Sequence, residues 1–314
     1  MANSTSSTDN TESQCLPLAT VHRTKSTLSN KRKTRRGRRQ KNNIVKNKYD
    51  KNSLCVIGQN VAGLLSKKDS LLSTINTLLP SVIICQETKM PKYGMLNLNG
   101  YQVFEKLRVE KSGGGLLVAV DKCISPVLLD SDDSFEIMTV EVSLSFGKLR
   151  IFNAYGPQEN YQIDVKRQFW LALEKEINKS KIEGCMVLLQ LDANAKVGQK
   201  IIPNAPNEEP SINGRFLIDM IQNQDLIMVN SSSLCKGSIT RQRIFEDKVE
   251  KSIIDYMIIC QRLEEFLIDL NIDEERIFSL YRCVKKKSTK KLVYSDHNMF
   301  IARFSIGISP LKSK

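Results

Sequence analysis

The sequence has 314 residues, 41% of them hydrophobic and 26% charged, which is the composition of a soluble protein long enough to bury a sizeable core. No apolar run approaches the length of about 20 residues that spans a bilayer, and the N-terminus lacks an apolar signal-peptide segment. These features exclude membrane-spanning and secreted classes, so we expect an intracellular protein without a membrane partner. The eight cysteines are scattered and include no CxxC pair, so neither a disulfide framework nor a structural zinc site is expected.

The net charge of +13 is concentrated near the N-terminus. Residues 1–51 contain 13 Lys and Arg against 3 Asp and Glu, whereas residues 52–314 contain 34 against 31. The leader has too little apolar surface to fold, so we expect a disordered basic leader over residues 1–51. It would bind nucleic-acid phosphates or direct nuclear import, with a solvated linker as the alternative. The side chains predicted to contact nucleic acid are Lys31, Arg32, Lys33, Arg35, Arg36, Arg38 and Arg39.

From residue 54 onward, short apolar runs rich in β-branched residues alternate with amphipathic segments. The apolar runs predict nine strands, at residues 54–60, 82–88, 115–122, 137–144, 149–155, 186–192, 226–231, 253–259 and 299–305. The amphipathic segments predict three helices, at residues 68–79, 161–179 and 213–224.

The predicted helices have defined ends and faces. Pro80 ends the first helix, and Asn213 with Gly214 opens the third. In the second helix, apolar side chains recur at spacings of three and four and should bury one face; they are Val165, Phe169, Ala172, Leu173 and Ile177.

The order of the elements predicts the fold class. Several strands between residues 115 and 155 follow one another without an intervening helix, which argues against a simple doubly wound parallel sheet. We therefore predict an α+β sandwich, in which two stacked mixed β-sheets are flanked by helices. Residues 52–314 contain no repeat and no second linker, so they are expected to form one domain.

Polar side chains stand at the ends of the predicted strands. The chain has only two histidines, and His297 is the one outside the leader; it follows Asp296 at the head of the last strand. A single residue of this kind would be interpreted as a turn former, but the recurrence predicts a site built over the sheet edges. The residues are Asn60, Glu87, Tyr155, Asp192, Asn194, Asp255, Asp296 and His297.

These side chains suit metal-assisted cleavage of phosphodiesters. Carboxylate and amide oxygens are hard ligands that select Mg²⁺, with Mn²⁺ as an alternative, over zinc. The ion would neutralise phosphate charge and an aspartate would deprotonate or orient the attacking water. A histidine oriented by a second carboxylate would hold the phosphate or share in proton transfer. A single core histidine excludes a His-rich metal centre, and no G-x-S-x-G nucleophile elbow is present.

The order of these motifs resembles that of the endonuclease/exonuclease/phosphatase superfamily over roughly residues 54 to 305. The matching segments are "QET", "NAYGPQ", "LDANA", "SIIDYMII" and "SDH". The resemblance implies a DNase I-like fold and a phosphoesterase that depends on Mg²⁺. It also implies the residues at the metal: Asn60, Glu87 and Asp296.

The same resemblance implies five catalytic roles. Asp192 would orient or deprotonate the attacking water, and Asp255 would orient His297 toward the phosphate. Tyr155 and Asn194 would contact the phosphate or the developing oxyanion.

Two further segments are similar to the endonuclease domains of non-LTR retrotransposons, which are themselves similar to apurinic endonucleases. They are "KSGGGLLVAVDK" (111–122) and "NGRFLIDMIQNQDLIMVNSS" (213–232). Two departures from the pattern stand out. Leu191 replaces the usual glycine before Asp192, and would either crowd the turn or continue the strand. The tryptophan that often follows the threonine of "SIT" is missing, which bears on substrate preference more than on chemistry.

The leading hypothesis is a Mg²⁺-dependent DNA endonuclease that nicks one strand and leaves a 3′-hydroxyl and a 5′-phosphate, with RNA as an alternative substrate. A nuclear location would fit its basic leader. One alternative is another phosphoesterase of the same fold, either an RNA deadenylase or a phosphatase. The other is an inactive protein that only binds nucleic acid. Because no candidate catalytic residue is missing, an active enzyme is expected.

Overall fold

The computed structural model describes residues 53–92, 94, 96–108, 113–129, 133–145, 147–245, 248–286 and 289–305. The basic leader predicted over residues 1–51 lies outside these ranges. By their contacts, the described residues group into one unit.

The first β-sheet is mixed, and its two central strands end at the site. β1 (Leu54–Asn60) runs parallel to β2 (Val82–Gln86), so Asn60 is paired with Gln86. On its other side β1 is antiparallel to β17 (Phe300–Phe304). Within the described residues the strand order is β10 (Cys235–Lys236), β14 (Leu267–Ile272), β17, β1, β2, β4 (Leu116–Asp121) and β3 (Tyr101–Lys106).

The second β-sheet is also mixed. β7 (Gly147–Tyr155) and β8 (Met186–Asp192) are parallel, and β8 is antiparallel to β13 (Asp255–Cys260). This register places Asp192 beside Tyr155 and opposite Asp255. Within the described residues the order is β5 (Pro126–Leu129), β6 (Ile137–Leu144), β7, β8, β13 and β9 (Leu226–Met228).

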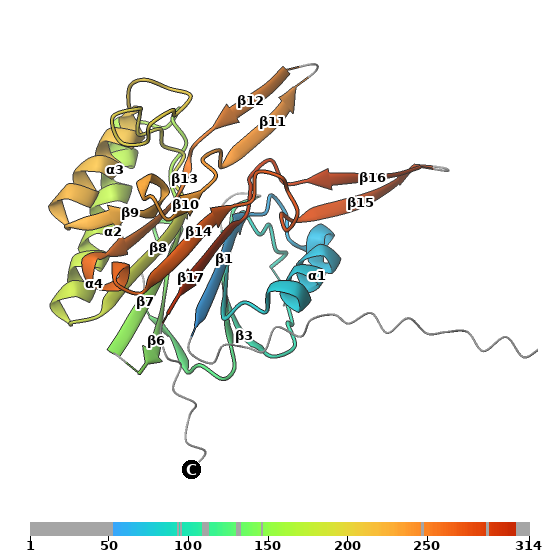
Figure 1. Cartoon of the computed structure of the whole chain (residues 1–314), viewed down its shortest axis with the longest axis horizontal. Helices are drawn as coiled ribbons and strands as arrows, with labels where there is room; N and C mark the ends of the chain where they lie inside the picture. Colours follow the sequence, from blue (N-terminus) through green and yellow to red (C-terminus); the bar gives the residue numbers. More distant parts are fainter. Residues whose placement is uncertain are drawn as a thin grey trace, which may run out of the picture. The chain divides into compact units, whose positions relative to one another are not determined.

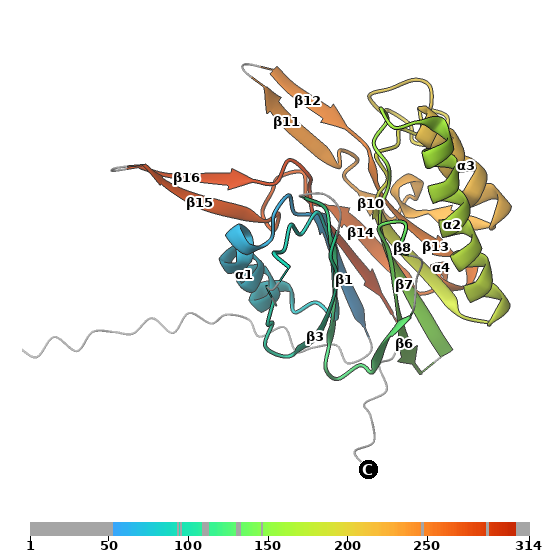
Figure 2. The ribbon, with the colours of Figure 1, turned by 180° about the vertical axis from the view of Figure 1, so that it is seen from behind.

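The two sheets pack face to face, as Figures 1 and 2 show. Because side chains of a strand alternate between its two faces, every second residue of each sheet enters the space between them. The resulting core contains fully buried residues from both sheets, among them Val56, Ile84, Ile151 and Leu189. This arrangement confirms the predicted α+β sandwich.

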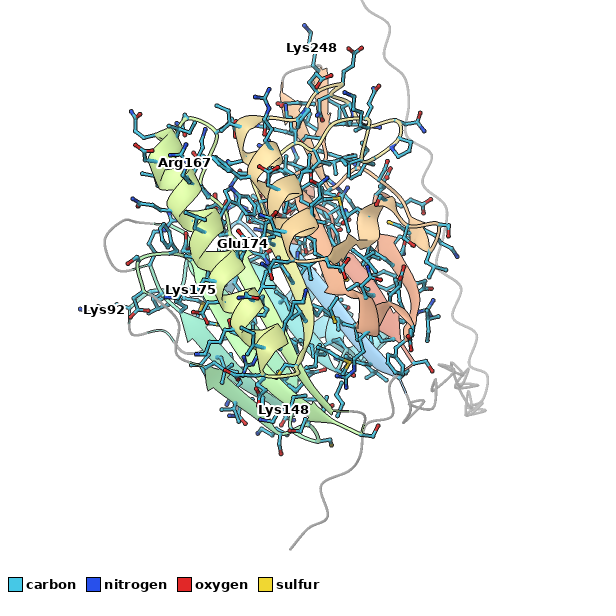
Figure 3. All side chains as sticks on the ribbon, turned by 90° about the vertical axis from the view of Figure 1, so that its left-hand side faces the viewer. Lys92, Lys148, Arg167, Glu174, Lys175 and Lys248 are labelled. Carbon is cyan, nitrogen blue, oxygen red and sulfur yellow. The ribbon has the colours of Figure 1, made fainter. Side chains whose placement is uncertain are left out.

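Helices cover the outer faces of the sandwich. On the first sheet, α1 (Lys68–Leu78) follows the short η1 (Leu65–Lys67) and packs through Leu71 and Ile75. On the second sheet lie α2 (Ile163–Ile182), α3 (Ile212–Asn223) and the short α4 (Gln261–Glu264), with η2 (Val229–Ser231) after β9. The charged side chains Arg167, Glu174 and Lys175 lie along the outer side of α2 in Figure 3. None of the helices described is long and apolar enough to cross a membrane.

Several predicted element bounds agree with the structure, and others are corrected by it. The strands predicted at 54–60, 137–144 and 186–192 have those bounds. β2 ends at Gln86, because Glu87 adopts a left-handed backbone (φ 48°) that an extended strand cannot continue through. The strand predicted at 226–231 stops at Met228 and turns into η2.

Two of the predicted helices also need correction. In α2 the buried face includes Phe169, Leu173, Ile177 and Trp170, whereas Val165 near the helix start is 37% exposed. The cap of α3 is Ser211, whose Oγ accepts a hydrogen bond from the N–H of Gly214 (3.2 Å). A Cβ at Gly214 would lie 1.9 Å from the carbonyl oxygen of Lys196, so close packing requires glycine there.

Two β-hairpins that were not predicted extend from the site end of the sandwich (Figures 1 and 2). One pairs β11 (Arg241–Phe245) with β12 (Lys248–Ser252), and the other pairs β15 (Tyr281–Lys286) with β16 (Thr289–Tyr294). Their sequences are mostly charged or polar and lack the apolar runs by which the other strands were predicted.

Candidate active site

A polar cleft of about 550 Å³ opens where strands of both sheets end. Six of the eight residues predicted at the site line it: Glu87, Tyr155, Asp192, Asn194, Asp296 and His297. The other two, Asn60 and Asp255, lie behind the cleft wall and are 0% and 1% exposed. The fold therefore brings all eight residues together, although they are up to 237 positions apart in the sequence.

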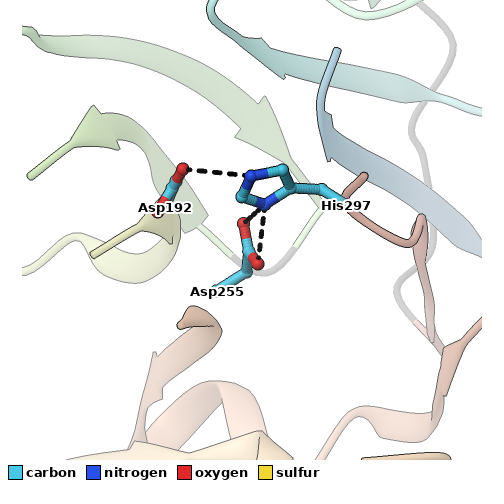
Figure 4. A group of neighbouring side chains, drawn as sticks. All are labelled: Asp192, Asp255 and His297. Atoms are coloured by element: carbon cyan, nitrogen blue, oxygen red, sulfur yellow. Dashed lines mark hydrogen bonds and ion pairs between the residues drawn. The ribbon is translucent and has the colours of Figure 1, made fainter. Parts of the chain in front are cut away.

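His297 forms a buried pair with Asp255 (Figure 4). Its Nδ1 lies 2.9 and 3.0 Å from the two carboxylate oxygens of Asp255. The opposite ring nitrogen, Nε2, faces the cleft, 3.8 Å from Oδ2 of Asp192 and 3.9 Å from Oδ1 of Asp296. Burial by itself lowers the pKa of His297, but the carboxylates of Asp255 and Asp192 outweigh it and raise the pKa to about 9.

The backbone around His297 is anchored to the first sheet. The side-chain amide of Gln59 donates to the carbonyl oxygen of His297 (2.7 Å), and Ser295 Oγ donates to the carbonyl oxygen of Asn60 (2.7 Å). β1 therefore holds the backbone around His297, and Asp255 on β13 holds the imidazole ring.

Asp192 is the last residue of β8 and has both carboxylate oxygens oriented. Oδ1 accepts from the N–H of Asn194 (3.1 Å), and Oδ2 accepts from Nδ2 of Asn60 (2.7 Å). Burial and the nearby carboxylate of Asp255 raise the pKa of Asp192 to about 7, although His297 and Asn60 act to lower it. A buried carboxylate that lines the cleft and has a raised pKa is suited to accept a proton there.

Leu191 continues the strand instead of crowding the turn. It is paired with Ala154 on one side and Tyr256 on the other, and its side chain is fully buried in the core. The chain turns only after Asp192, at Asn194, which has a left-handed backbone (φ 47°).

Glu87 is held by three donors at the open side of the cleft. Its Oε1 accepts from Nδ2 of Asn60 (3.0 Å) and from the hydroxyl of Tyr155 (3.1 Å), while Oε2 pairs with Nζ of Lys89 (2.9 Å). Burial acts to raise the pKa of Glu87, but these donors lower it overall. Asn60 Oδ1 accepts from the N–H of Ala62 (3.0 Å), so the amide offers its donor side to the carboxylates.

Asp296 is paired with a cation on the other rim of the cleft. Its Oδ2 lies 3.0 Å from Nε of Arg241, and its side chain is 34% exposed. Burial acts to raise the pKa of Asp296, but His297 and Arg241 lower it overall. Arg241 is the first residue of β11 and forms a β-bridge with His297, so the base of this hairpin is part of the site.

Tyr155 is held as a neutral donor. Burial and the carboxylates of Asp192 and Glu87 raise the pKa of Tyr155 far above neutrality, so its hydroxyl remains protonated. The guanidinium of Arg108 lies 5.6 Å from the centre of its ring.

Asn194 is fixed by the start of α3. Its Nδ2 donates to the carbonyl oxygen of Gly156 (2.9 Å), and its own carbonyl oxygen accepts from Nδ2 of Asn213 (3.3 Å). Asn213 in turn donates to Pro157 (2.6 Å) and accepts from Nε1 of Trp170 (3.1 Å). The "NG" pair that was predicted to open α3 thus supports the loop after Asp192.

The sequence analysis did not predict four residues of the site. Lys89 and Arg241 pair with the open carboxylates, and Thr240 Oγ1 accepts from the N–H of Asp255 (3.1 Å). Lys67 is 5% exposed and donates to the carbonyl oxygens of the turn after Asn60, including that of Val61 (2.7 Å). Lys89 and Arg241 had a signal, since Lys89 directly follows "QET" and Arg241 directly follows "SIT"; a buried lysine has none.

The donor set suits a divalent cation. Glu87 and Asp296 line one cleft, and the cations that pair with them, Lys89 and Arg241, are 43% and 23% exposed and can move. Mg²⁺ is usually bound through one or two carboxylates together with water and phosphate.

Asp192, Asp255 and His297 form a second set, with ligand atoms within 4.8 Å of one another, that could hold a metal by donor type. Both oxygens of Asp255 are already engaged by the imidazole of His297, which accounts for the closeness of this group.

The fold is the DNase I-like α+β sandwich that the sequence motifs predicted. No protein-family model and no curated protein matches the sequence. Among solved structures, the endonuclease domain of TRAS1, a telomere-specific non-LTR retrotransposon, is similar, with 16% identity and a TM-score of 0.60 over 80% of this chain and 98% of that one.

Two other solved structures have the same fold. The Xenopus laevis APE2 catalytic domain has 14% identity and a TM-score of 0.63, over 83% of this chain and 94% of its own. The 3′ phosphatase NExo from Neisseria, bound to product DNA hairpin, has 14% identity and a TM-score of 0.61, over 80% and 99%. At these identities the likeness establishes the fold.

Proposed function

We propose that this chain is a metal-dependent nucleic-acid phosphodiesterase, and specifically a DNA endonuclease that nicks one strand. The observation that carries the proposal is the convergence of six predicted residues on one polar cleft at the strand ends. Similar solved structures include a retrotransposon endonuclease domain and a DNA-bound 3′ phosphatase, which supports a nucleic-acid substrate.

In this proposal the buried side chains move the protons. Asp192 orients the attacking water at the cleft wall and takes its proton, for which the raised pKa of this carboxyl is suited. His297, charged at neutral pH, donates from Nε2 to a phosphate oxygen. Asp255 holds Nδ1 and so fixes the direction in which the imidazole points. The water oxygen bonds to phosphorus as the P–O3′ bond breaks, and the leaving 3′ oxygen takes a proton from solvent, which leaves a 3′-hydroxyl and a 5′-phosphate.

The open side chains receive the phosphate and the cation. Glu87 and Asp296 would hold a divalent ion, with Asn60 orienting Glu87. When bound, Mg²⁺ or Mn²⁺ supplies positive charge that neutralises the phosphate and the leaving oxygen. In this proposal the hydroxyl of Tyr155, which donates to Glu87 in the structure, turns to a phosphate oxygen, and the amide of Asn194 donates to the phosphate at the same opening.

The basic leader would add affinity that does not depend on sequence. Its Lys and Arg residues over 31–39 can displace counterions from phosphates, so binding should fall steeply with salt. A nuclear location remains a proposal that rests on the same basic run.

The test is nicking of supercoiled plasmid at low salt, with Mg²⁺ and then with EDTA, by the full chain and by His297→Asn. We expect conversion to open circles that requires the metal and is lost in the variant. Asp164→Asn, on the exposed start of α2, is the matched control and should cut like the wild type.

The substrate class is decided by three oligonucleotides, carrying an abasic site, a 3′-phosphate or an RNA strand. Preference for the abasic strand would indicate a repair-type endonuclease, and removal of only the 3′-phosphate would indicate a phosphatase. DNA that is bound but not cut by the wild type would contradict the catalytic proposal and leave a binding protein.

A further inference from the structure

The β15–β16 hairpin holds the positive charge of the folded part of the chain. Residues 281–294, "YRCVKKKSTKKLVY", contain six Lys and Arg and no Asp or Glu. Residues 52–314 as a whole contain 34 basic and 31 acidic residues, so the remainder without the hairpin has 28 against 31. The rest of this range is therefore slightly acidic, and the hairpin alone makes it basic.

The basic side chains of the hairpin that the structure describes are available to a partner. Arg282, Lys290 and Lys291 are exposed, and within the described part of the chain none of them has an ion-pair partner. Leu292 on the same hairpin is 46% exposed. A two-stranded ribbon whose faces pack on little else is only marginally stable in water, so its length is not explained by the core.

The base of the hairpin is fixed beside the active site. The rings of Tyr281 and Tyr294 lie 5.3 Å apart, and the guanidinium of Arg276 lies 5.8 Å from the centre of the Tyr294 ring. The N–H of Tyr281 donates to Ser70 Oγ on α1 (3.3 Å). Tyr294 precedes Asp296 by only two residues. The ribbon thus starts at the rim of the cleft and points outward (Figures 1 and 2).

The hairpin has the size and charge to follow a nucleic-acid duplex. At about 3.3 Å per residue, a six-residue strand reaches roughly 20 Å. A duplex rises about 3.4 Å per base pair, so the arm would span roughly six base pairs next to the scissile phosphate. The major groove of B-DNA admits a two-stranded β-ribbon.

We propose that the β15–β16 hairpin is a nucleic-acid-binding arm that contacts duplex phosphates on one side of the scissile bond. This inference rests on the proposed function of the cleft. The arm differs from the β11–β12 hairpin, where Arg241 is committed to Asp296 and Glu250 offsets part of the positive charge.

The test compares two triple variants of the full chain, each losing three positive charges. One is Arg282→Gln with Lys290→Gln and Lys291→Gln. The matched control is Arg167→Gln with Lys175→Gln and Lys179→Gln, three exposed side chains of α2, of which Figure 3 labels the first two. Both keep the basic leader. Binding to a labelled duplex of about 30 base pairs is measured in EDTA over a range of salt, so that no cleavage is needed.

We expect the hairpin variant to bind the long duplex roughly tenfold or more weakly at low salt. The slope of log affinity against log salt should become less steep by about 3, because each of the three lost phosphate contacts contributes about 0.9. The control variant should have the slope of the wild type. In nicking assays KM should rise and kcat should stay within about twofold. A duplex of about eight base pairs, with about four on each side of the scissile phosphate, would cover only part of the arm, so the difference should shrink.

An unchanged salt dependence in the hairpin variant would overturn the proposal. So would loss of binding to a polyaspartate peptide with duplex binding retained, because the arm would then serve an acidic protein surface. If the triple variant melts at a lower temperature, the single variants Lys290→Gln and Lys291→Gln decide, each with an expected slope change of about one. A changed slope without nicking by the wild type would leave the arm standing and contradict only the proposed activity.

Discussion

The cleft has a buried side and an open side, and the two hold their charges differently. The buried side consists of Asp192, Asp255 and His297, all at most 5% exposed, in which carboxylates and an imidazole satisfy one another. On the open side, Glu87 and Asp296 pair with lysine and arginine side chains that can move away. In the proposed mechanism the buried side would be preorganised for proton transfer, whereas the open side would exchange its partners for a cation or a phosphate.

The pKa shifts on the two sides have opposite signs. On the buried side, desolvation and carboxylate neighbours raise the pKa of Asp192, and the surrounding carboxylates raise that of His297. On the open side, donors and cations lower the pKa of Glu87 and Asp296. Opposite shifts of this kind separate groups that transfer protons from groups that remain ionised to hold a cation.

The largest expected effect on nicking comes from removing Asp192, the proposed proton acceptor on the buried side. Asp192→Asn keeps the shape of the side chain but removes its basicity, so we expect nicking to fall roughly 10³-fold or more. Because the deficit is in proton transfer, higher Mg²⁺ or Mn²⁺ should not restore it. Single-turnover nicking rates across a metal titration measure both effects.

Asp219→Asn, on the exposed side of α3, is the control for this change and should nick normally. The melting temperature of Asp192→Asn should stay within a few degrees of the wild type. Activity that returns at high metal concentration would mean that Asp192 acts mainly on the cation, and the distinction between the two sides would fail.

Glu87→Gln should have a smaller effect that metal can repair. The neutral amide attracts a cation less, so we expect roughly a 100-fold loss at low Mg²⁺ and substantial recovery at high Mg²⁺ or with Mn²⁺. The measurement is the metal concentration that gives half-maximal nicking. Glu174→Gln on the outer side of α2 is the matched control (Figure 3).

A Glu87→Gln enzyme that never recovers at any metal concentration would place Glu87 with the proton-transfer residues. The comparison with Asp192→Asn is informative because both variants replace one carboxylate by its isosteric amide in the same cleft.

The sequence predicted the sandwich and its polar strand ends because both depend on local pattern. Apolar β-branched runs such as 186–192 end in residues that the core cannot accept, and the fold brings those ends together. Leu191 shows the limit of motif matching, because whether it crowded a turn or continued the strand depended on its pairing with Ala154 and Tyr256.

The hairpins and the cations at the cleft rim could not be predicted from the sequence, for a physical reason. β15 and β16 are stabilised by each other and by contacts at their base, and the apolar side chains of each strand stop partway along it, so neither shows the alternating pattern of a core strand. The buried Lys67 and the donor orientation of Asn60 depend on backbone oxygens and carboxylates that only the folded chain supplies. The prediction that Asn60 binds metal stays a prediction, since its amide oxygen accepts from Ala62.

The smallest expected effect is the pH dependence of stability in the metal-free protein. The pKa of His297 is about 9 in the folded chain, above the ordinary value of about 6.5 expected on unfolding. The folded state therefore binds more protons than the unfolded state between these values, and stability falls as pH rises. The stabilisation by His297 is full below about pH 6.5, and we expect about 2 kcal/mol of it to be lost between pH 7 and 9.

The measurement is denaturant unfolding in EDTA at several pH values, for the wild type and His297→Asn. The difference in unfolding free energy between the two should shrink from pH 7 to 9. Glu87→Gln is the control from the open side: its lowered pKa affects stability only as pH falls through the acid range, so its difference from the wild type should be flat over the same interval. A flat difference for His297→Asn as well would mean that the imidazole is neutral in the folded protein. It would then have to take up a proton from water before it could donate one.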